Sequence, residues 1–343
     1  MPRMNVRHES KYRYATPVEF GEHRMMFRPR DSHDLRLLKA TLDIRPAPAA
    51  IRWRHDVFGN SVAVASFTSP ADTLTFVSEI DIDHFEGAEP DCPIEPYAEI
   101  YPFSYPLVEL PDLARSIERH YPDPDHAVDL WARRFLRDTR PRTMDLLTEL
   151  TAAIKADGFA YAERDAEGVQ TPAETLRLRS GTCRDFALLM IEAARALKFA
   201  ARFVSGYLYV PRLDTNAQQP AERDSKPAAA APQQKPAPAP AAPSAGTGRG
   251  GGATHAWVQI YLPGAGWVEF DPTNAIVGNR DLIRVAVARD PSQAVPLAGT
   301  WTGAPSDFLG LSVDVRVSTV SDATETAAAT AEAAPAGRSV SQF

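Results

Sequence analysis

Ser180-Gly181-Thr182-Cys183-Arg184-Asp185 opens a stretch in which apolar residues recur at steps of three and four positions. This spacing predicts an amphipathic helix that carries Cys183, Ala187, Met190, Ile191, Ala194 and Leu197 on one face. Thr182 and Asp185 have the spacing of a capping box, so Cys183 is expected in the first helical turn. The free N–H groups and the dipole of a helix start favour an anion, and the thiolate is the reactive form of cysteine. The stretch therefore predicts a nucleophile at Cys183.

A second interpretation of Cys183 stays open at this point, because a lone cysteine on a helix is more often a small buried hydrophobe. Two later segments bear on the choice. His255-Ala256-Trp257-Val258-Gln259-Ile260-Tyr261 alternates, which predicts a strand with His255, Trp257, Gln259 and Tyr261 on one face. Trp267-Val268-Glu269-Phe270-Asp271 predicts a second strand, which Pro272 ends. The two strands are expected to form a hairpin across the turn signal at 263–266.

The loop of this hairpin decides whether His255 and Asp271 share a face. The two side chains lie on the same face only if the residue numbers of each cross-strand pair have an even sum. This holds, for example, when residue 257 lies opposite residue 271. A four-residue loop at 263–266 would give an odd sum and point Asp271 away. We therefore predict a three- or five-residue loop, or a bulge at Gly264 or Gly266, which glycine accommodates.

The chemistry of a thiol nucleophile explains why these residue types belong together. A thiol needs a base, histidine is a suitable base near neutral pH, and a carboxylate can fix the tautomer of that histidine. We predict a triad in which His255 deprotonates Cys183, the thiolate attacks an amide carbonyl to form a thioester, and Asp271 orients His255. The backbone N–H of Cys183 is a candidate donor to the oxyanion, and the sequence names no second donor.

The three motifs resemble those of a known family. Gly181-Thr182-Cys183-Arg184-Asp185, Thr254-His255-Ala256-Trp257-Val258 and Trp267-Val268-Glu269-Phe270-Asp271-Pro272-Thr273 are similar to the Cys, His and Asp motifs of the bacterial transglutaminase-like superfamily. The resemblance implies an α+β fold in which an N-terminal antiparallel β-sandwich precedes a papain/transglutaminase-like core, with the nucleophile helix packed on an antiparallel sheet. It also implies acyl transfer from a peptide or side-chain amide. Hydrolysis by a cysteine peptidase or amidase is favoured over amine cross-linking, because a cross-linker must exclude water. The alternative is a catalytically silent protein-binding module on the same fold.

The predicted domains follow from changes in composition. Residues 1–90 contain short alternating stretches separated by turn residues, which predicts the N-terminal β domain. Residues 91–320 are assigned to the transglutaminase-like catalytic domain. Within it, residues 211–253 are rich in Pro, Ala, Gln, Ser and Gly and are expected to form a disordered insertion. A disordered tail is expected at 321–343.

Three further residues near the motifs are candidates for the substrate cleft. Trp257 could line the cleft and exclude water, although a core tryptophan is the alternative. Arg184 and Asp185 could contact substrate, although a local ion pair or cap is the alternative. A metal site built from the predicted triad is disfavoured, because no second thiol or paired histidine lies at ligand spacing. We therefore expect no metal and no cofactor.

Composition limits the class of protein. The chain has 343 residues, a net charge of −7, 44% hydrophobic residues and 24% charged residues, which is typical of a soluble globular protein. The acidic balance, without a basic stripe, argues against nucleic-acid binding. Two cysteines, Cys92 and Cys183, imply no disulfide framework. Residues 1–30 contain no apolar signal-peptide core, and no run of about 18 apolar residues occurs. We therefore expect a cytoplasmic location, no membrane partner, and a protein or peptide substrate.

Overall fold

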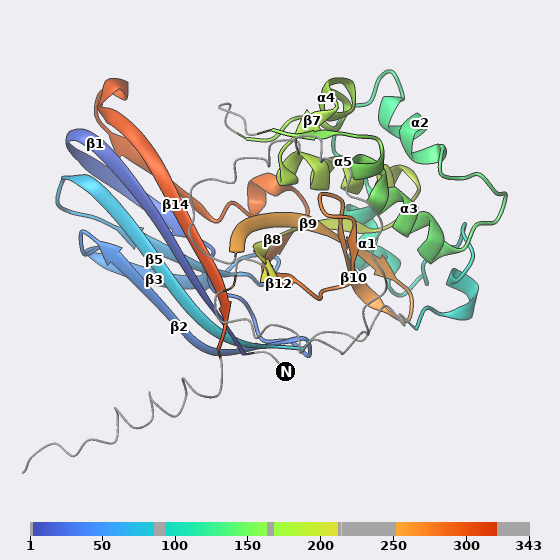
Figure 1. The fold of residues 1–343 in the computed structure, drawn as a ribbon, viewed down its shortest axis with the longest axis horizontal. Coiled ribbons are helices and arrows are strands. Elements are labelled where there is room, and N and C mark those ends of the chain that lie inside the picture. Colours follow the sequence, from blue (N-terminus) through green and yellow to red (C-terminus); the bar gives the residue numbers. More distant parts are fainter. Residues whose placement is uncertain (1–2, 86–92, 163–167, 212–213, 215–251, 321–343) are drawn as a thin grey trace, which may run out of the picture.

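The structure, a computed structural model, describes residues 3–85, 93–162, 168–211, 214 and 252–320. An N-terminal β region lies beside a core of helices and strands (Figure 1). Helices α1–α5 lie on the side of the molecule opposite the N-terminal region, and strands β8, β9 and β12 lie between the helices and that region.

One long strand organises the N-terminal region. The first half of β1 (Arg3–Met25) pairs with β5 (Ala71–His84) and β14 (Phe308–Thr319). Its second half pairs with β4 (Ser61–Ser66) and β13 (Leu297–Thr302). The outer strands are β2 (Leu35–Arg45), which pairs with β5, and β3 (Ala50–His55), which pairs with β4. All of these pairs are antiparallel.

Residues from both halves of this region share one buried apolar cluster. It contains Tyr14, Val18, Phe20, Met25, Phe27, Ile44, Ala63, Ala65, Leu74 and Phe76. Their strands come from the group around β5 and from the group around β4, which β1 joins into one seven-stranded sheet, so both groups contribute to a shared apolar core. This arrangement confirms the expected antiparallel β-sandwich. A turn at Phe58-Gly59-Asn60 joins β3 to β4, with Gly59 at φ 75°.

The end of the chain differs from the predicted division at residue 90. Strands β13 and β14, which fall in the range 91–320 expected to form the catalytic domain, pair with β1 instead. Alternation of polar and apolar residues identifies a strand, but it does not identify a partner as distant in sequence as Val317 is from Val6.

The core consists of five helices and a five-stranded antiparallel sheet. The helices are α1 (Leu110–Ile117), α2 (Ala127–Arg133), α3 (Thr143–Ala156), α4 (Pro172–Leu178) and α5 (Cys183–Ala196). In sheet order the strands are β11 (Ile276–Val277), β10 (Gly266–Asp271), β9 (Gly252–Leu262), β8 (Ala201–Tyr209) and β12 (Leu282–Ala288). A short parallel pair, β6 (Ala160–Tyr161) and β7 (Ser180–Gly181), lies just before α5.

Helix α5 is the centre of this core. Almost all of its side chains are buried, because α2, α3 and α4 pack around it and one face lies on β8 and β9. The buried residues include the charged Glu192 and Arg195, which form an ion pair with each other at 2.9 Å. The predicted helix therefore begins at Cys183, as expected from the sequence, and its first turn lies at the end of the sheet that carries β9.

Part of the predicted insertion at 211–253 is described. Residues 252–253 begin β9, and Asp214 accepts hydrogen bonds from Tyr209 Oη at 2.9 Å and from the Thr319 N–H at 2.8 Å. Asp214 thus connects the end of β8 to β14. The other residues of the insertion, apart from Pro211, lie outside the described residues, as do Cys92 and the tail at 321–343.

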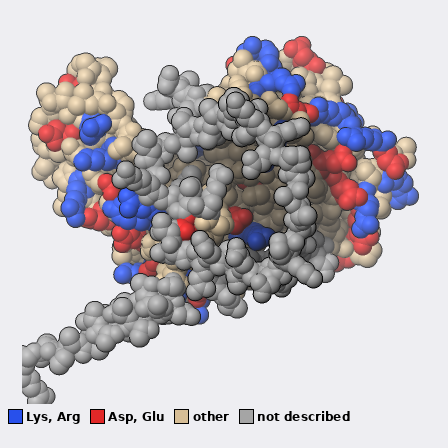
Figure 2. All heavy atoms as spheres, in the orientation of Figure 1, with Lys and Arg blue, Asp and Glu red and all other residues tan. Residues whose placement is uncertain are grey.

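The visible surface mixes charges of both signs. In Figure 2, the Lys, Arg, Asp and Glu side chains drawn in colour are interspersed over both parts of the molecule. The helices of the described ranges are all too short or too polar to cross a membrane.

Candidate active site

The hairpin of β9 and β10 brings His255 and Asp271 to the same face of the sheet. Leu262 lies opposite Gly266, and Tyr261 lies opposite Trp267, so the loop contains the three residues 263–265. The opposed numbers have an even sum, and of the predicted alternatives, a three-residue loop, a five-residue loop or a bulge, the structure has the first. Gly264 has φ 89° and Gly266 has φ 75°, conformations that glycine adopts with little strain.

The three residues of the predicted triad lie in a row. Asp271 Oδ2 is 2.8 Å from His255 Nε2, and the Cys183 thiol forms a hydrogen bond with the His255 ring. Because Asp271 occupies Nε2, the nitrogen that remains for the sulfur is Nδ1. The residues are 9% (Cys183), 7% (His255) and 0% (Asp271) exposed, so little water reaches these contacts.

The carboxylate of Asp271 is held from several directions. Oδ1 accepts the backbone N–H of Thr273 at 2.9 Å, and Oδ2 accepts Asn274 Nδ2 at 2.7 Å. Burial alone would raise the pKa of Asp271. The charge of His255 and these hydrogen bonds outweigh burial and lower that pKa. Asp271 is therefore ionised, and its position next to the imidazole is fixed.

The sulfur and the imidazole change each other's ionisation. Burial opposes the Cys183 thiolate, but the hydrogen bond and charge of His255 outweigh it and lower the pKa of the thiol. Burial also opposes the His255 cation, but Asp271 and the thiolate raise the pKa of the ring. Both directions favour a thiolate–imidazolium pair, which is the reactive state of a cysteine nucleophile.

The structure adds donors to the sulfur that sequence reasoning missed. The Tyr161 side chain and the Ala256 N–H both form hydrogen bonds with Cys183, and both lower the pKa of its thiol. Tyr161 reaches the site because β6 pairs in parallel with β7, which places Tyr161 opposite Gly181. A two-residue strand produces no periodic pattern, so the sequence carried no signal for this contact. Asn274 was missed as well, although its place just after Asp271-Pro272-Thr273 is typical of a turn that closes on an Asp side chain.

The sulfur opens into a cavity of about 230 Å³. One side consists of core residues, namely Cys183, Arg184, Ser205, Thr254, His255 and Ala256. The other side consists of residues from β1, β14 and the segment leading into β13, namely His8, Ser10, Tyr12, Pro296, Leu297, Leu311 and Val313. The N-terminal region therefore forms one wall of the cavity, a role that sequence analysis did not predict.

His8 is a titratable group in that wall. Its Nδ1 lies 3.0 Å from Tyr207 Oη and its Nε2 lies 2.9 Å from Ser10 Oγ. Burial lowers the pKa of His8 to about 4, so the ring is neutral at neutral pH. His8 therefore places a neutral polar group, rather than a second cation, near Cys183.

The three cleft candidates from the sequence have different positions. Arg184 lines the cavity and donates to the Pro291 carbonyl at 2.8 Å. Trp257 is a core tryptophan, which is the alternative that the sequence left open: it is fully buried behind His255, with ring centroids 6.0 Å apart and planes at 25°, and it does not line this cavity. Asp185 is also outside the cavity. Its carboxylate accepts the N–H groups of Thr182 at 2.8 Å and Gln170 at 2.7 Å, so it is a buried cap of α5.

Among the described residues, no group of three or more His, Cys, Asp and Glu side chains is arranged to hold a metal ion.

Relatives of the whole chain occur in mycobacteria. Uncharacterized proteins of Mycobacterium bovis and of Mycobacterium tuberculosis strain H37Rv are each 28% identical over 326 residues, covering 91% of this chain and 92% of each relative. An uncharacterized protein of Mycobacterium leprae is 24% identical over 315 residues, covering 92% of this chain and 99% of the relative.

A solved structure shares the fold. A protein of Cytophaga hutchinsonii, whose crystal structure is described as that of a "Putative Cysteine Protease", superposes with a TM-score of 0.61 at 17% identity. The superposition covers 93% of this chain and 91% of the other chain. The likeness extends across both the N-terminal region and the core.

Family models match both parts of the chain. The model of the bacterial transglutaminase-like N-terminal region matches residues 4–83, and the model of the transglutaminase-like superfamily matches residues 131–272. The second range contains Cys183, His255 and Asp271. The chain therefore belongs to the transglutaminase-like superfamily, with a bacterial transglutaminase-like N-terminal region ahead of the core.

Proposed function

We propose that this protein is a cysteine enzyme that transfers the acyl group of a peptide or side-chain amide through a thioester on Cys183. The row of Cys183, His255 and Asp271 at one end of a cavity carries this proposal. The sulfur has a base next to it, the base has an ionised carboxylate at 2.8 Å, and both hydrogen-bonded contacts are shielded from water.

The proposed reaction uses the proton that His255 takes from the thiol. The Cys183 thiolate attacks the amide carbonyl carbon, a C–S bond forms, and the carbonyl oxygen becomes an oxyanion. The His255 cation then gives its proton to the leaving nitrogen, the C–N bond breaks, and the thioester remains. In the second half, His255 takes a proton from water, the resulting hydroxide attacks the thioester, and a carboxylic acid leaves as the thiol is restored.

The oxyanion needs donors that are already in place. The N–H of Cys183 at the start of α5 is one candidate, because the first turn of a helix has free N–H groups. The Tyr161 hydroxyl is the second candidate, because the Tyr161 side chain already forms a hydrogen bond with the Cys183 sulfur. That sulfur is the atom to which the tetrahedral carbon becomes attached. This assigns Tyr161 a function in the transition state.

Replacing Tyr161 with phenylalanine tests that function. We expect Tyr161→Phe to lower kcat roughly 10²-fold, the effect of removing one oxyanion donor, with a much smaller change in KM. Steady-state kinetics on a peptide amide would measure both. An unchanged kcat would contradict the assignment. The ring of Tyr161 packs edge-on against Phe186, and the variant keeps this contact, so it should fold normally.

For the second half of the reaction we favour water over an amine as the acyl acceptor. The sequence analysis favoured hydrolysis as well. A cavity of about 230 Å³ holds a short chain segment beside the sulfur and leaves little space for a second large substrate. The name given to the Cytophaga hutchinsonii structure also suggests a protease. The cytoplasmic location stays a prediction.

Product analysis with glutamine-containing peptides tests the proposal. The protein is incubated with the peptides, with and without a primary amine, and both the products and Cys183 are analysed by mass spectrometry. Cleaved or deamidated peptide would support hydrolysis, and incorporated amine would support cross-linking. Absence of any product and of any Cys183 adduct across the peptide set would contradict an enzyme and favour the catalytically silent binding module.

A further inference from the structure

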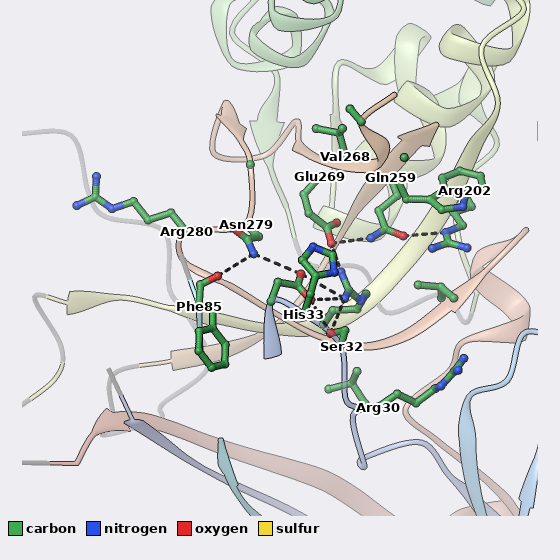
Figure 3. Close-up of a pocket in the computed structure, with 18 of the residues that line it drawn as sticks. Arg30, Ser32, His33, Phe85, Arg202, Gln259, Val268, Glu269, Asn279 and Arg280 are labelled. Carbon is green, nitrogen blue, oxygen red and sulfur yellow. Dashed lines mark hydrogen bonds and ion pairs between the residues drawn. The ribbon is translucent and has the colours of Figure 1, made fainter. Parts of the chain in front are cut away.

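A second and larger cavity lies on the other side of the core sheet from α5. Its volume is about 950 Å³. Residues 30–34 of the N-terminal region line one side, and residues of β8, β9, β10 and β12 line the other (Figure 3). Trp267 and Phe58 add aromatic surface to its lining. Nothing in the proposed reaction uses this space.

The polar side chains of this cavity form a connected row. Arg202, Gln259 and Glu269 lie directly opposite one another on β8, β9 and β10. Gln259 accepts Arg202 Nε at 2.7 Å through its oxygen and donates to Glu269 at 2.6 Å through its nitrogen. Figure 3 shows these two contacts side by side. The amide of Gln259 therefore stands between a cation and a carboxylate.

The carboxylates of Glu269 and Asp34 form ion pairs with a different arginine, Arg284. Arg284 Nη1 lies 2.6 Å from Glu269, and Arg284 Nη2 lies 3.0 Å from Asp34. Trp257 also donates to Glu269, so the charge of Glu269 is compensated without Arg202. These contacts fix the acidic side of the cavity.

Arg202 has no such acidic partner. Within the part of the chain that the structure describes, no carboxylate lies at ion-pair distance from its guanidinium, which instead lies 3.9 Å from the centre of the Trp267 ring. Burial opposes the Arg202 cation, Glu269 supports it, and the nearby charges of Arg284 and Arg30 oppose it, which together lower the pKa of Arg202 to about 10. Arg202 is thus protonated at neutral pH, with the Glu269 carboxylate beyond Gln259 and the charges of Arg284 and Arg30 nearby.

Arg30 is a second cation in the lining, on the wall formed by the N-terminal region, whereas Arg202 belongs to the wall formed by the sheet. In the view of Figure 3 both arginines lie to the right, whereas Arg280 lies to the left and points away from the connected row. Arg30 Nη1 donates to the Phe58 carbonyl at 3.4 Å, and no described carboxylate forms an ion pair with it. Two arginines that have no carboxylate partner among the described residues therefore line this cavity.

We propose that this cavity binds the oxyanion group of a small molecule, a carboxylate or a phosphate, through Arg202 and Arg30. Guanidinium groups present planar pairs of N–H donors that match both oxyanions. An anion there would relieve the repulsion between the cations, and Trp267 and Phe58 would contact the rest of the molecule. Most small-molecule sites likewise combine apolar walls with a few polar anchors.

This site is separate from the one that contains Cys183. Trp257 lines neither cavity, and it lies between them, with His255 against its ring and Glu269 at its Nε1. A bound anion therefore need not touch the sulfur. Binding should persist in Cys183→Ala, so this proposal does not depend on the proposed reaction.

Calorimetric titration tests the proposal with three probes, inorganic phosphate, acetate and benzoate, each against sodium chloride at equal ionic strength. We expect saturable binding of at least one probe to the wild-type protein and to Cys183→Ala. Arg202→Gln and Arg30→Gln should each weaken it about tenfold or more, since each removes a charged hydrogen-bond donor. Arg36→Gln, an exposed arginine on β2 outside this cavity, is the matched control and should bind as wild type does.

The pattern across variants decides the outcome. Preference for phosphate or for benzoate would identify the source of the oxyanion, and either supports the site. Binding no stronger than the chloride control for all three probes would overturn it, as would equal weakening by Arg36→Gln. Because Arg30 is exposed, Arg30→Gln should fold even if Arg202→Gln does not, and full binding by a folded Arg30→Gln would also contradict the proposal.

Discussion

Replacing Cys183 with alanine is expected to lower kcat/KM for a peptide amide at least about 10⁴-fold. The nucleophile and its base act as a unit, so loss of the sulfur leaves only what the oxyanion donors and substrate binding supply. Product release measured by mass spectrometry, compared with wild-type protein at equal concentration, would show the effect.

Two controls separate loss of chemistry from loss of fold. Cys183 lies at the edge of the main apolar cluster and is the first residue of α5, so removing one sulfur atom should change unfolding free energy by only about 1 kcal/mol. Cys183→Ser keeps a polar atom in place and should be nearly as inactive, because a hydroxyl does not ionise beside His255. A folded Cys183→Ala protein with activity close to wild type would show that another group performs the reaction.

Replacing Asp271 with alanine is the second large expected effect, a fall in kcat of about 10²–10⁴-fold. Asp271 supports the His255 cation and fixes Nε2, and without it the ring loses both its charge partner and its orientation. The pKa of His255 should fall and that of Cys183 should rise. Activity should therefore appear only at higher pH than in wild type. The pH dependence of kcat/KM measures this shift.

Asp271→Asn distinguishes the two contributions of the carboxylate. The amide oxygen still accepts the His255 N–H, but it carries no charge, so kcat should lie between those of wild type and Asp271→Ala. Equal kcat values and equal pH profiles for all three proteins would contradict the assigned function of Asp271. Thermal unfolding of each variant is needed as well, because removing one partner from a buried charged pair can cost about 3–5 kcal/mol.

The parts of the site that the sequence predicted are those with local causes. A capping box and an apolar repeat locate the start of α5, and alternation identifies the faces of β9 and β10. These signals depend on residues within a few positions of one another. The register between the two strands was inferred from the requirement that His255 and Asp271 share a face, and the local sequence left more than one loop length open.

The parts that the sequence did not predict depend on contacts between distant segments. Tyr161 reaches the sulfur through a two-residue strand, and β14 closes the cavity by pairing with the first strand of the chain. Trp257 was placed on the correct face of β9, but whether that face was open to a cleft depended on what covered it. No pattern within a single segment carries this information.

The most direct test of the central claim is the pH dependence of Cys183 alkylation by iodoacetamide, followed at Cys183 by peptide mass spectrometry. In wild-type protein we predict that the rate reaches its plateau well below pH 8.5, the value typical of a free thiol, because His255 stabilises the thiolate. In His255→Gln, burial still opposes the Cys183 thiolate but His255 no longer stabilises it. The inflection in the pH dependence of the alkylation rate should therefore move above about pH 8.5. A wild-type inflection at or above the value of a free thiol, or the same profile in both proteins, would contradict the claim that His255 activates Cys183.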